Sequence, residues 1–134
     1  MLVQKRSQTS DTFPGTLDCS VSEHLKVGES YFDGAVRGLH EELGIEGIPL
    51  TRLVQFKMNY GPNDNEFSEL FKGVFDGGSV LIDPGEVAGI EYFTISQLEE
   101  MMDSKQALFA PWFIQLIRFY TGKPADMEII SNQN

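Results

Sequence analysis

The chain of 134 residues carries 20 acidic and 10 basic side chains, a formal net charge of −10, and is 41% hydrophobic and 22% charged. This composition is typical of a single globular domain, whose core at this size makes disulfides and structural zinc unnecessary. The excess of carboxylates argues against nucleic acid or anionic membranes as partners, because both carry negative charge themselves.

Cys19 is the only cysteine, so it excludes an internal disulfide and any metal site built from several cysteines. A single thiol suits a reducing compartment. No apolar run reaches the roughly 18 residues of a membrane span, and the first residues lack the apolar stretch of a secretory signal. We therefore expect a cytoplasmic protein without a membrane partner.

The apolar spacing changes repeatedly between strand-like and helix-like periods, which predicts interleaved α/β layers rather than a helical bundle or a β-sandwich. In chain order, the pattern predicts strands at 2–6 and 16–22, a helix at 31–43, strands at 51–60, 66–75 and 89–95, and helices at 96–102 and 111–120. The two strands around the turn at 61–65 are expected to pair antiparallel.

Local signals mark the ends of these elements. Ser30 is a suitable N-cap and Gly44 a suitable C′ glycine for the first helix. Ser96 opens a capping box with Glu99, and Pro111 suits the first turn of the last helix. We expect one domain over residues 1–122, followed by a polar tail at 123–134.

The opening strand starts at once, at Leu2, which suggests that an N-terminal edge strand of the sheet is missing. An exposed sheet edge tends to pair with another chain, so a homodimer is one expected arrangement.

Polar side chains cluster on the predicted helix at 31–43. Arg37 and Gly38 precede Glu41 and Glu42 by three to five residues, so we expect all four on one polar face, opposite Leu39 and Leu43. Neighbouring carboxylates favour a cation between them, and their hard oxygens suit Mg²⁺ or Mn²⁺, which also bind diphosphates. The hypothesis is metal-assisted attack of water on a diphosphate. The alternative is a solvated face with an Arg37–Glu41 ion pair.

At these residues the sequence resembles the Nudix hydrolases. Their signature runs Gly, five residues, Glu, seven residues, Arg-Glu, an aliphatic residue, one residue, Glu-Glu, one residue, Gly and an aliphatic residue. The positions that match it are Glu29, Arg37, Leu39, Glu41, Glu42, Gly44 and Ile45. Two positions depart from it, since Glu23 replaces the opening Gly and Gly38 replaces the Glu after Arg.

The resemblance implies a Nudix-type α/β/α sandwich with a mixed β-sheet. It implies that Glu41 and Glu42 are ligands of Mg²⁺ or Mn²⁺ and act in catalysis, while Glu29 and Arg37 support the loop. Gly38 contributes no oxygen, where the family supplies a third carboxylate. A structural explanation for glycine at both 34 and 38 is that another backbone approaches that face of the helix closely.

The flanking residues look most like the branch related to isopentenyl-diphosphate isomerase. His24 matches a metal-binding histidine of that enzyme, but Ser22 stands at the position of its catalytic cysteine, so isomerase activity is not expected. Glu66 resembles part of a downstream acid pair and is a third candidate metal ligand. Its alternative is an outward-facing strand acid.

Further residues carry weaker hypotheses. Glu86 lies in a loop where related hydrolases often place a base, and Phe13 could stack on a nucleobase. His24 is more typical of a hydrogen-bonded loop residue, and Cys19 of a buried thiol.

The sequence thus predicts a metal-dependent hydrolase of a nucleoside diphosphate linked to another moiety. The alternative is a catalytically weak or inactive binding module that keeps the Nudix fold, which the two departures from the signature favour. In both cases the expected partner is a small-molecule diphosphate.

Overall fold

The computed structural model describes residues 1–10, 13–22, 24–59, 65–105 and 107–132, with the side chains of residues 59, 65, 66 and 132 excepted. The elements within these residues, in chain order, are β1 (Leu2–Arg6), β2 (Leu17–Asp18), α1 (Tyr31–Leu43), β3 (Leu50–Asn59), β4 (Asn65–Gly73), β5 (Val87–Tyr92), α2 (Ile95–Ser104), α3 (Pro111–Tyr120) and β6 (Glu128–Asn132).

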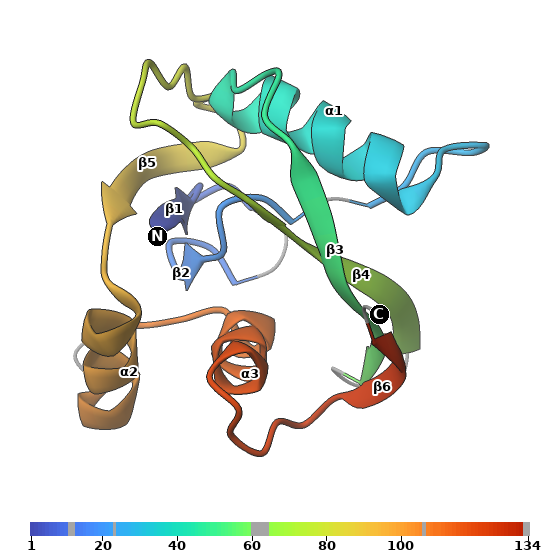
Figure 1. Ribbon diagram of the computed structural model, residues 1–134. Coiled ribbons are helices and arrows are strands. Elements are labelled where there is room, and N and C mark those ends of the chain that lie inside the picture. Colours follow the sequence, from blue (N-terminus) through green and yellow to red (C-terminus); the bar gives the residue numbers. More distant parts are fainter. Residues whose placement is uncertain (11–12, 23, 60–64, 106, 133–134) are drawn as a thin grey trace.

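The strands form two sheets, ordered β2-β1-β5 and β4-β3-β6. The ladders within both sheets are antiparallel, and a single parallel bridge joins Leu17 to Phe109. In Figure 1, α1 lies on one side of the strands and α2 and α3 on the other. The α/β/α layers predicted from the sequence are therefore confirmed.

Strand β1 is the centre of its sheet, and its side chains alternate between the two layers. Leu2 packs in a core cluster with Leu43 and Ile45 on the α1 side. Val3 packs on the opposite side with Phe113 of α3. Gln4 is therefore on the α1 side, as every second residue of a strand is.

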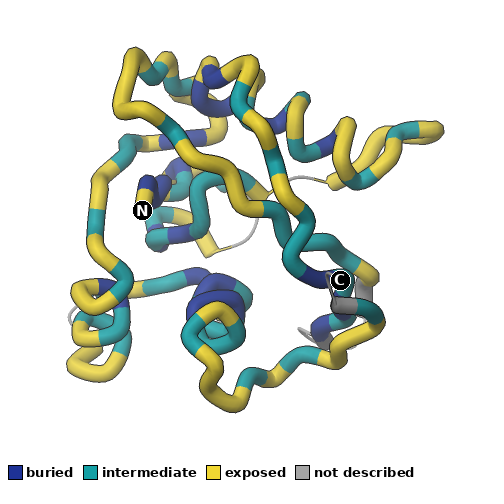
Figure 2. The backbone as a smooth tube through the Cα atoms, in the orientation of Figure 1, coloured by how far each residue is buried: buried dark blue, intermediate teal, exposed yellow. Residues whose placement is uncertain are grey.

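The second sheet packs on α3 through Val54, Phe56 and Met58 of β3, which contact Leu116. Figure 2 shows the contrast with the segment that leads into α1, which is exposed over most of residues 24–30. This exposed segment carries Glu29, one of the candidate site residues.

Helix α1 begins and ends where the sequence predicts. The Ser30 side chain accepts from the Asp33 backbone N–H at 3.1 Å, and Gly44 takes a left-handed conformation at φ 66° that glycine adopts without strain. The final helix also matches its predicted bounds, from Pro111 to Tyr120.

Two local predictions are wrong. The capping box of α2 is formed by Thr94 and Gln97, not by Ser96 and Glu99, so the helix begins at Ile95 and extends to Ser104. The polar tail predicted at 123–134 contains β6, which pairs antiparallel with β3 from Val54 to Lys57. Backbone hydrogen bonds to β3 and the packing of Met127 on the core hold this segment despite its polar composition.

No helix in the described ranges is long and apolar enough to span a membrane.

Candidate active site

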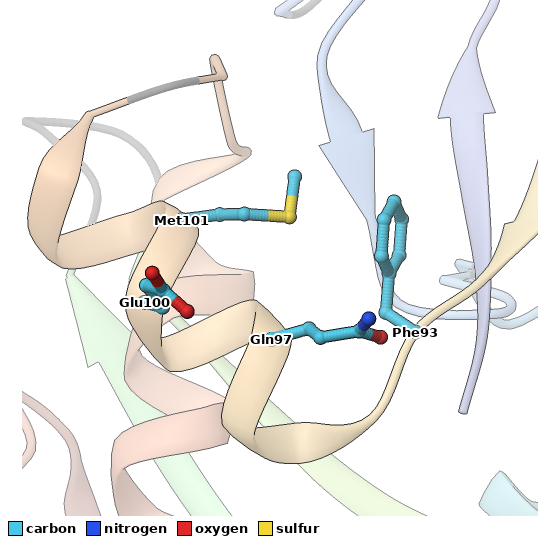
Figure 3. Close-up of a pocket in the computed structure, with 4 residues that line it drawn as sticks. All are labelled: Phe93, Gln97, Glu100 and Met101. Atoms are coloured by element: carbon cyan, nitrogen blue, oxygen red, sulfur yellow. The ribbon is translucent and has the colours of Figure 1, made fainter.

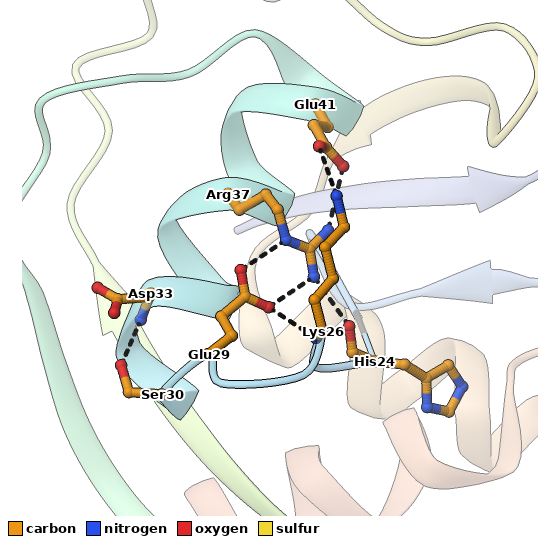
Figure 4. A network of polar contacts seen from close by, with 7 residues as sticks. All are labelled: His24, Lys26, Glu29, Ser30, Asp33, Arg37 and Glu41. Atoms are coloured by element: carbon orange, nitrogen blue, oxygen red, sulfur yellow. Dashed lines mark hydrogen bonds and ion pairs between the residues drawn. The ribbon is translucent and has the colours of Figure 1, made fainter.

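A network of charged groups ties the loop at 24–29 to helix α1 (Figure 4). Arg37 donates from Nε to Glu29 Oε2 at 2.8 Å and from Nη2 to Glu29 Oε1 at 2.9 Å. The same Nη2 donates to the backbone carbonyl of His24 at 2.8 Å. This bidentate ion pair holds the guanidinium of Arg37 and the carboxylate of Glu29 in one plane. The two side chains therefore hold the loop at 24–29 against α1.

The pKa of Glu29 reflects this arrangement. Hydrogen bonds from Arg37, and then from the Lys26 backbone N–H, lower the pKa of Glu29 to about 2. Glu29 is therefore ionised at every pH at which a folded protein is normally studied.

Glu41 lies on the outer side of α1, where 46% of its side chain is exposed. Its carboxylate accepts from Arg37 Nη1 at 3.1 Å and lies 3.7 Å from Lys26 Nζ. Both partners are cations, so much of the charge of Glu41 is balanced within the protein itself.

Glu42, the next residue, points the other way. It is only 6% exposed, and its Oε1 accepts from Gln4 Nε2 of β1 at 3.1 Å. The prediction of one polar face shared by Arg37, Gly38, Glu41 and Glu42 is therefore wrong for Gly38 and Glu42, which lie on the buried side of the helix. A residue that follows directly on a helix is rotated by about 100°, and this rotation separates the two carboxylates.

The inner face of α1 carries two glycines one turn apart. Gly34 and Gly38 are both buried, in line with Glu42. A Cβ added at Gly34 would lie 2.4 Å from Leu25 Cδ2 and 3.3 Å from Glu29 Oε1. The absence of a side chain at Gly34 thus allows the 24–29 loop to approach the helix.

Beside Glu42, the interior contains a second buried carboxylate. Asp18 is 1% exposed and accepts from the Cys19 backbone N–H at 2.7 Å, Trp112 Nε1 at 2.8 Å and Arg6 Nη1 at 3.1 Å. Burial raises the pKa of Asp18, and these hydrogen bonds oppose that rise. The cluster joins β1, β2 and α3.

Cys19 is not a reactive thiol in this environment. Its Sγ donates to the Val21 carbonyl at 3.4 Å. Burial, reinforced by the Asp18 carboxylate, raises the pKa of the Cys19 thiol well above its ordinary value. The interpretation of Cys19 as a packing residue agrees with this position.

The other candidates from the sequence are His24, Glu66 and Glu86. The His24 ring points away from the network of Figure 4, to which its backbone carbonyl contributes. The backbone of Glu66 pairs with Met58, but its side chain lies outside the described part of the chain, as does the whole of Glu23. Glu86 is exposed, and its carbonyl accepts from the Ser7 backbone N–H at 3.2 Å. Among the residues that the structure describes, no group of three or more histidine, cysteine or acidic side chains is placed to hold a metal ion.

A small open pocket of about 240 Å³ lies beside α2, lined by Phe93, Gln97, Glu100 and Met101 (Figure 3). None of these side chains belongs to the network around α1. The pocket is therefore a separate surface feature.

Sequence reasoning missed Gln4 and Asp18. Both are polar residues at the inward positions of short strands, Gln4 in line with Leu2 and Asp18 directly before Cys19. A polar side chain at a buried strand position needs a hydrogen-bond partner, and this signal could have identified both.

The layered fold and the braced loop–helix segment define a Nudix-type domain. A family model described as NUDIX domain matches residues 1–113, and the chain belongs to this family. A Nudix hydrolase from Shigella flexneri, named YfcD and described as uncharacterized, is 28% identical over 99% of this chain and 71% of its own. An isopentenyl-diphosphate Delta-isomerase from Jannaschia sp. is 26% identical over 95% of this chain and 73% of its own.

Solved structures agree on the fold. The protein DR0079 from Deinococcus radiodurans superposes with a TM-score of 0.74 at 23% identity, covering 88% of this chain and 72% of its own. The NUDIX domain of NrtR from Shewanella oneidensis, solved with ADP ribose, gives a TM-score of 0.70 at 15% identity, covering 90% of this chain and 75% of its own.

Proposed function

We propose that this chain is a divalent-metal-dependent hydrolase that cleaves the diphosphate of a nucleoside diphosphate linked to another moiety. The observation that carries the proposal is the buried carboxylate of Glu42, held next to Glu41 at the end of a motif helix that Glu29 and Arg37 brace. Membership of the Nudix family supports a hydrolase. ADP ribose, bound in the Shewanella neighbour, belongs to the proposed class of compound.

The residues present fit a metal site that the substrate completes. Mg²⁺ is usually bound through one or two protein carboxylates, with water and substrate phosphates as its other ligands. Glu42 would supply one carboxylate from the inner face of α1, and Glu41 would supply a second from the outer face once it leaves Arg37 and Lys26, with Glu66 as a third candidate on β4. A bound Mg²⁺ or Mn²⁺ would neutralise the diphosphate and acidify the attacking water.

The protein's own groups divide the remaining work. The Glu29–Arg37 pair keeps the loop and helix together when a charged substrate arrives. The buried position of Glu42 limits water around its carboxylate, which strengthens any interaction with a cation. To bind a cation, Glu41 must either keep its ion pairs with Arg37 and Lys26 at the same time or release these two side chains.

A second candidate function is a binding module with little activity. Two specific observations favour it: Gly38 supplies no carboxylate on the inner face of α1, and two cations already balance Glu41. Isomerase activity is not proposed, because Ser22 stands where the isomerases carry a cysteine.

The deciding experiment measures hydrolysis of ADP ribose and a panel of related nucleoside diphosphate compounds, with Mg²⁺ and with a chelator. We expect Mg²⁺-dependent release of nucleoside monophosphate by the wild type and none by the double variant Glu41→Gln, Glu42→Gln. The matched control is Glu100→Gln, which removes an exposed acid of α2 far from the motif. Calorimetric binding of ADP ribose without hydrolysis would instead establish the binding module.

A further inference from the structure

Gln4 donates a hydrogen bond to the Glu42 carboxylate from the central strand of the first sheet. It lies at the centre of β1, paired with Asp18 on one side and Ile90 on the other. Two ladders therefore fix its backbone, and its side chain is only 3% exposed. A side chain so enclosed has few rotamers available to it.

The amide of Gln4 uses its two N–H groups on two different segments. Its Nε2 donates to the Ser20 carbonyl at 2.7 Å and to Glu42 Oε1 at 3.1 Å. The Ser20 hydroxyl donates in turn to the Leu2 carbonyl of the same strand. The side-chain amide of Gln4 thus connects the first sheet with the segment after β2 and with the end of α1.

The backbone of Glu42 is fixed separately. Its carbonyl accepts from the Asp83 N–H at 3.0 Å, and the carbonyl of Leu43 accepts from the Leu81 N–H at 2.8 Å. Since the backbone at the end of α1 is held by the loop at 81–83, the contact with Gln4 selects the direction of the side chain. Glu41 is instead held by the side chains of Arg37 and Lys26 on the outer face of the helix.

The chemical nature of the partner matters. An amide donates a hydrogen bond without neutralising the carboxylate, whereas a lysine at the same position would compete with a metal ion. Carboxylates that bind metals are commonly oriented in this way by neighbouring hydrogen-bond donors.

We infer that Gln4 is a positioning residue, which orients the Glu42 carboxylate for a divalent cation. This inference rests on the proposed function, because it takes Glu42 to be a metal ligand. It adds a residue outside the motif helix to the site, from the strand that the helix packs against.

The test is a titration of the purified full chain with Mn²⁺, followed by electron paramagnetic resonance of the free ion. The variants are Gln4→Met, which keeps the size and removes the donor, and Glu42→Gln. The matched control is Gln115→Met, which removes a half-buried amide of α3 that accepts from the Asp126 N–H. We expect Gln4→Met to raise the dissociation constant of Mn²⁺ by roughly 10- to 100-fold, and Gln115→Met to leave it within about twofold.

The outcomes separate the two proposals. If Glu42→Gln abolishes binding but Gln4→Met binds Mn²⁺ like the wild type, the positioning role is overturned and the proposed metal site stands. If the wild type itself binds no Mn²⁺, the proposed function fails and the positioning role fails with it. A lower melting temperature of Gln4→Met with unchanged Mn²⁺ affinity would reduce Gln4 to a packing residue.

A second measurement on the wild type covers the case in which Gln4→Met does not fold. The side-chain amide resonances of Gln4 and Gln115 are followed by NMR as Mg²⁺ is added. We expect the Gln4 resonance to shift with saturation of the site and the Gln115 resonance to stay in place. Equal behaviour of the two amides would overturn the inference.

Discussion

The outer and inner faces of α1 both carry a glutamate of the motif, but they hold it in different ways. On the outer face, Glu41 is half exposed and is bound by two cations on long side chains. On the inner face, Glu42 is buried and accepts from a neutral amide on a central strand. The outer carboxylate is balanced in charge and loosely placed, whereas the inner one is firmly placed.

Under the proposed function, this difference assigns separate roles to the two faces. The outer face carries Arg37, which ties the loop to the helix, and the inner face would offer an oriented oxygen ligand to the metal ion. The two roles are carried by different residues, so substitutions can separate them.

The largest expected effect comes from removing the inner carboxylate. Glu42→Gln should lower hydrolysis by at least about 100-fold, because a charged group that acts in the transition state is lost. Glu41→Gln should cost about tenfold or less, since its charge is already balanced by Arg37 and Lys26. Steady-state rates of both single variants with Mg²⁺ check this. A larger loss for Glu41→Gln would reverse the assignment of the two faces.

Restoring the missing carboxylate should act in the opposite direction. Gly38→Glu places an acid one turn before Glu42 and also replaces a poor helix former, so hydrolysis should rise about tenfold, equivalent to about 1.4 kcal/mol of transition-state stabilisation. Stabilisation by Mg²⁺ over a chelator should also grow, because three carboxylates repel one another without a cation. Rates and thermal melts in both conditions test this. A variant that melts lower than the wild type even in Mg²⁺ would show that Gly38 serves close packing.

Removing the Glu29–Arg37 ion pair should lower the stability of the fold more than the rate of hydrolysis. Arg37→Met removes the partners of Glu29, Glu41 and the His24 carbonyl together, and we expect the melting temperature to fall by several degrees. Arg52→Met, which removes a more exposed arginine paired with Glu69, is the matched control and should change it less. Differential scanning calorimetry of both variants gives the comparison, and equal shifts would argue against a brace.

The stabilisation that the Glu29–Arg37 ion pair gives to the fold should also depend on pH. The pKa of Glu29 is about 2 in the folded chain, against an ordinary value of 4.5, so unfolding takes up a proton between these two pH values. The stabilisation is complete above about pH 4.5 and is lost as the pH falls through about 2. The difference in melting temperature between wild type and Glu29→Gln should therefore be constant near neutral pH and shrink in this acidic range. A difference that persists unchanged at pH 2 would contradict the lowered pKa.

The smallest effect is expected for Lys26→Ala. Its ion pair with Glu41 is exposed at both ends, so its contribution to stability should be at most about 1 kcal/mol. The melting temperature should hardly change, whereas Mn²⁺ affinity should rise by a small factor as one competing cation leaves. Unchanged affinity would indicate that Glu41 takes no part in metal binding.

Much of the motif helix was predictable because its signals are local. Ser30 and Gly44 mark its ends through backbone geometry that depends on few neighbours. The brace between Glu29 and Arg37 follows from the family resemblance and is present in the structure.

What the sequence did not predict depends on distant partners. The partner of the inward-turned Glu42 is Gln4, which lies 38 residues away in the chain. Strand β6 forms along the edge of β3 that β4 leaves open, and within its own sequence Ile129 and Ile130 favour a strand. The start of α2 at Thr94 was missed because two overlapping capping boxes are compatible with the sequence, and only the neighbouring strand end decides between them.

The position of β1 has a consequence for how the chain folds. This strand is the first element of the chain and the middle strand of its sheet, yet its long ladder pairs Leu2 with Tyr92. The Asp18–Trp112 hydrogen bond spans 94 residues in the same region. Contacts between residues so far apart in sequence form only when a large loop closes, and this slows folding. We therefore expect the Gln4–Glu42 contact to form late in folding, because the strand that carries Gln4 pairs with β5, which lies near residue 90.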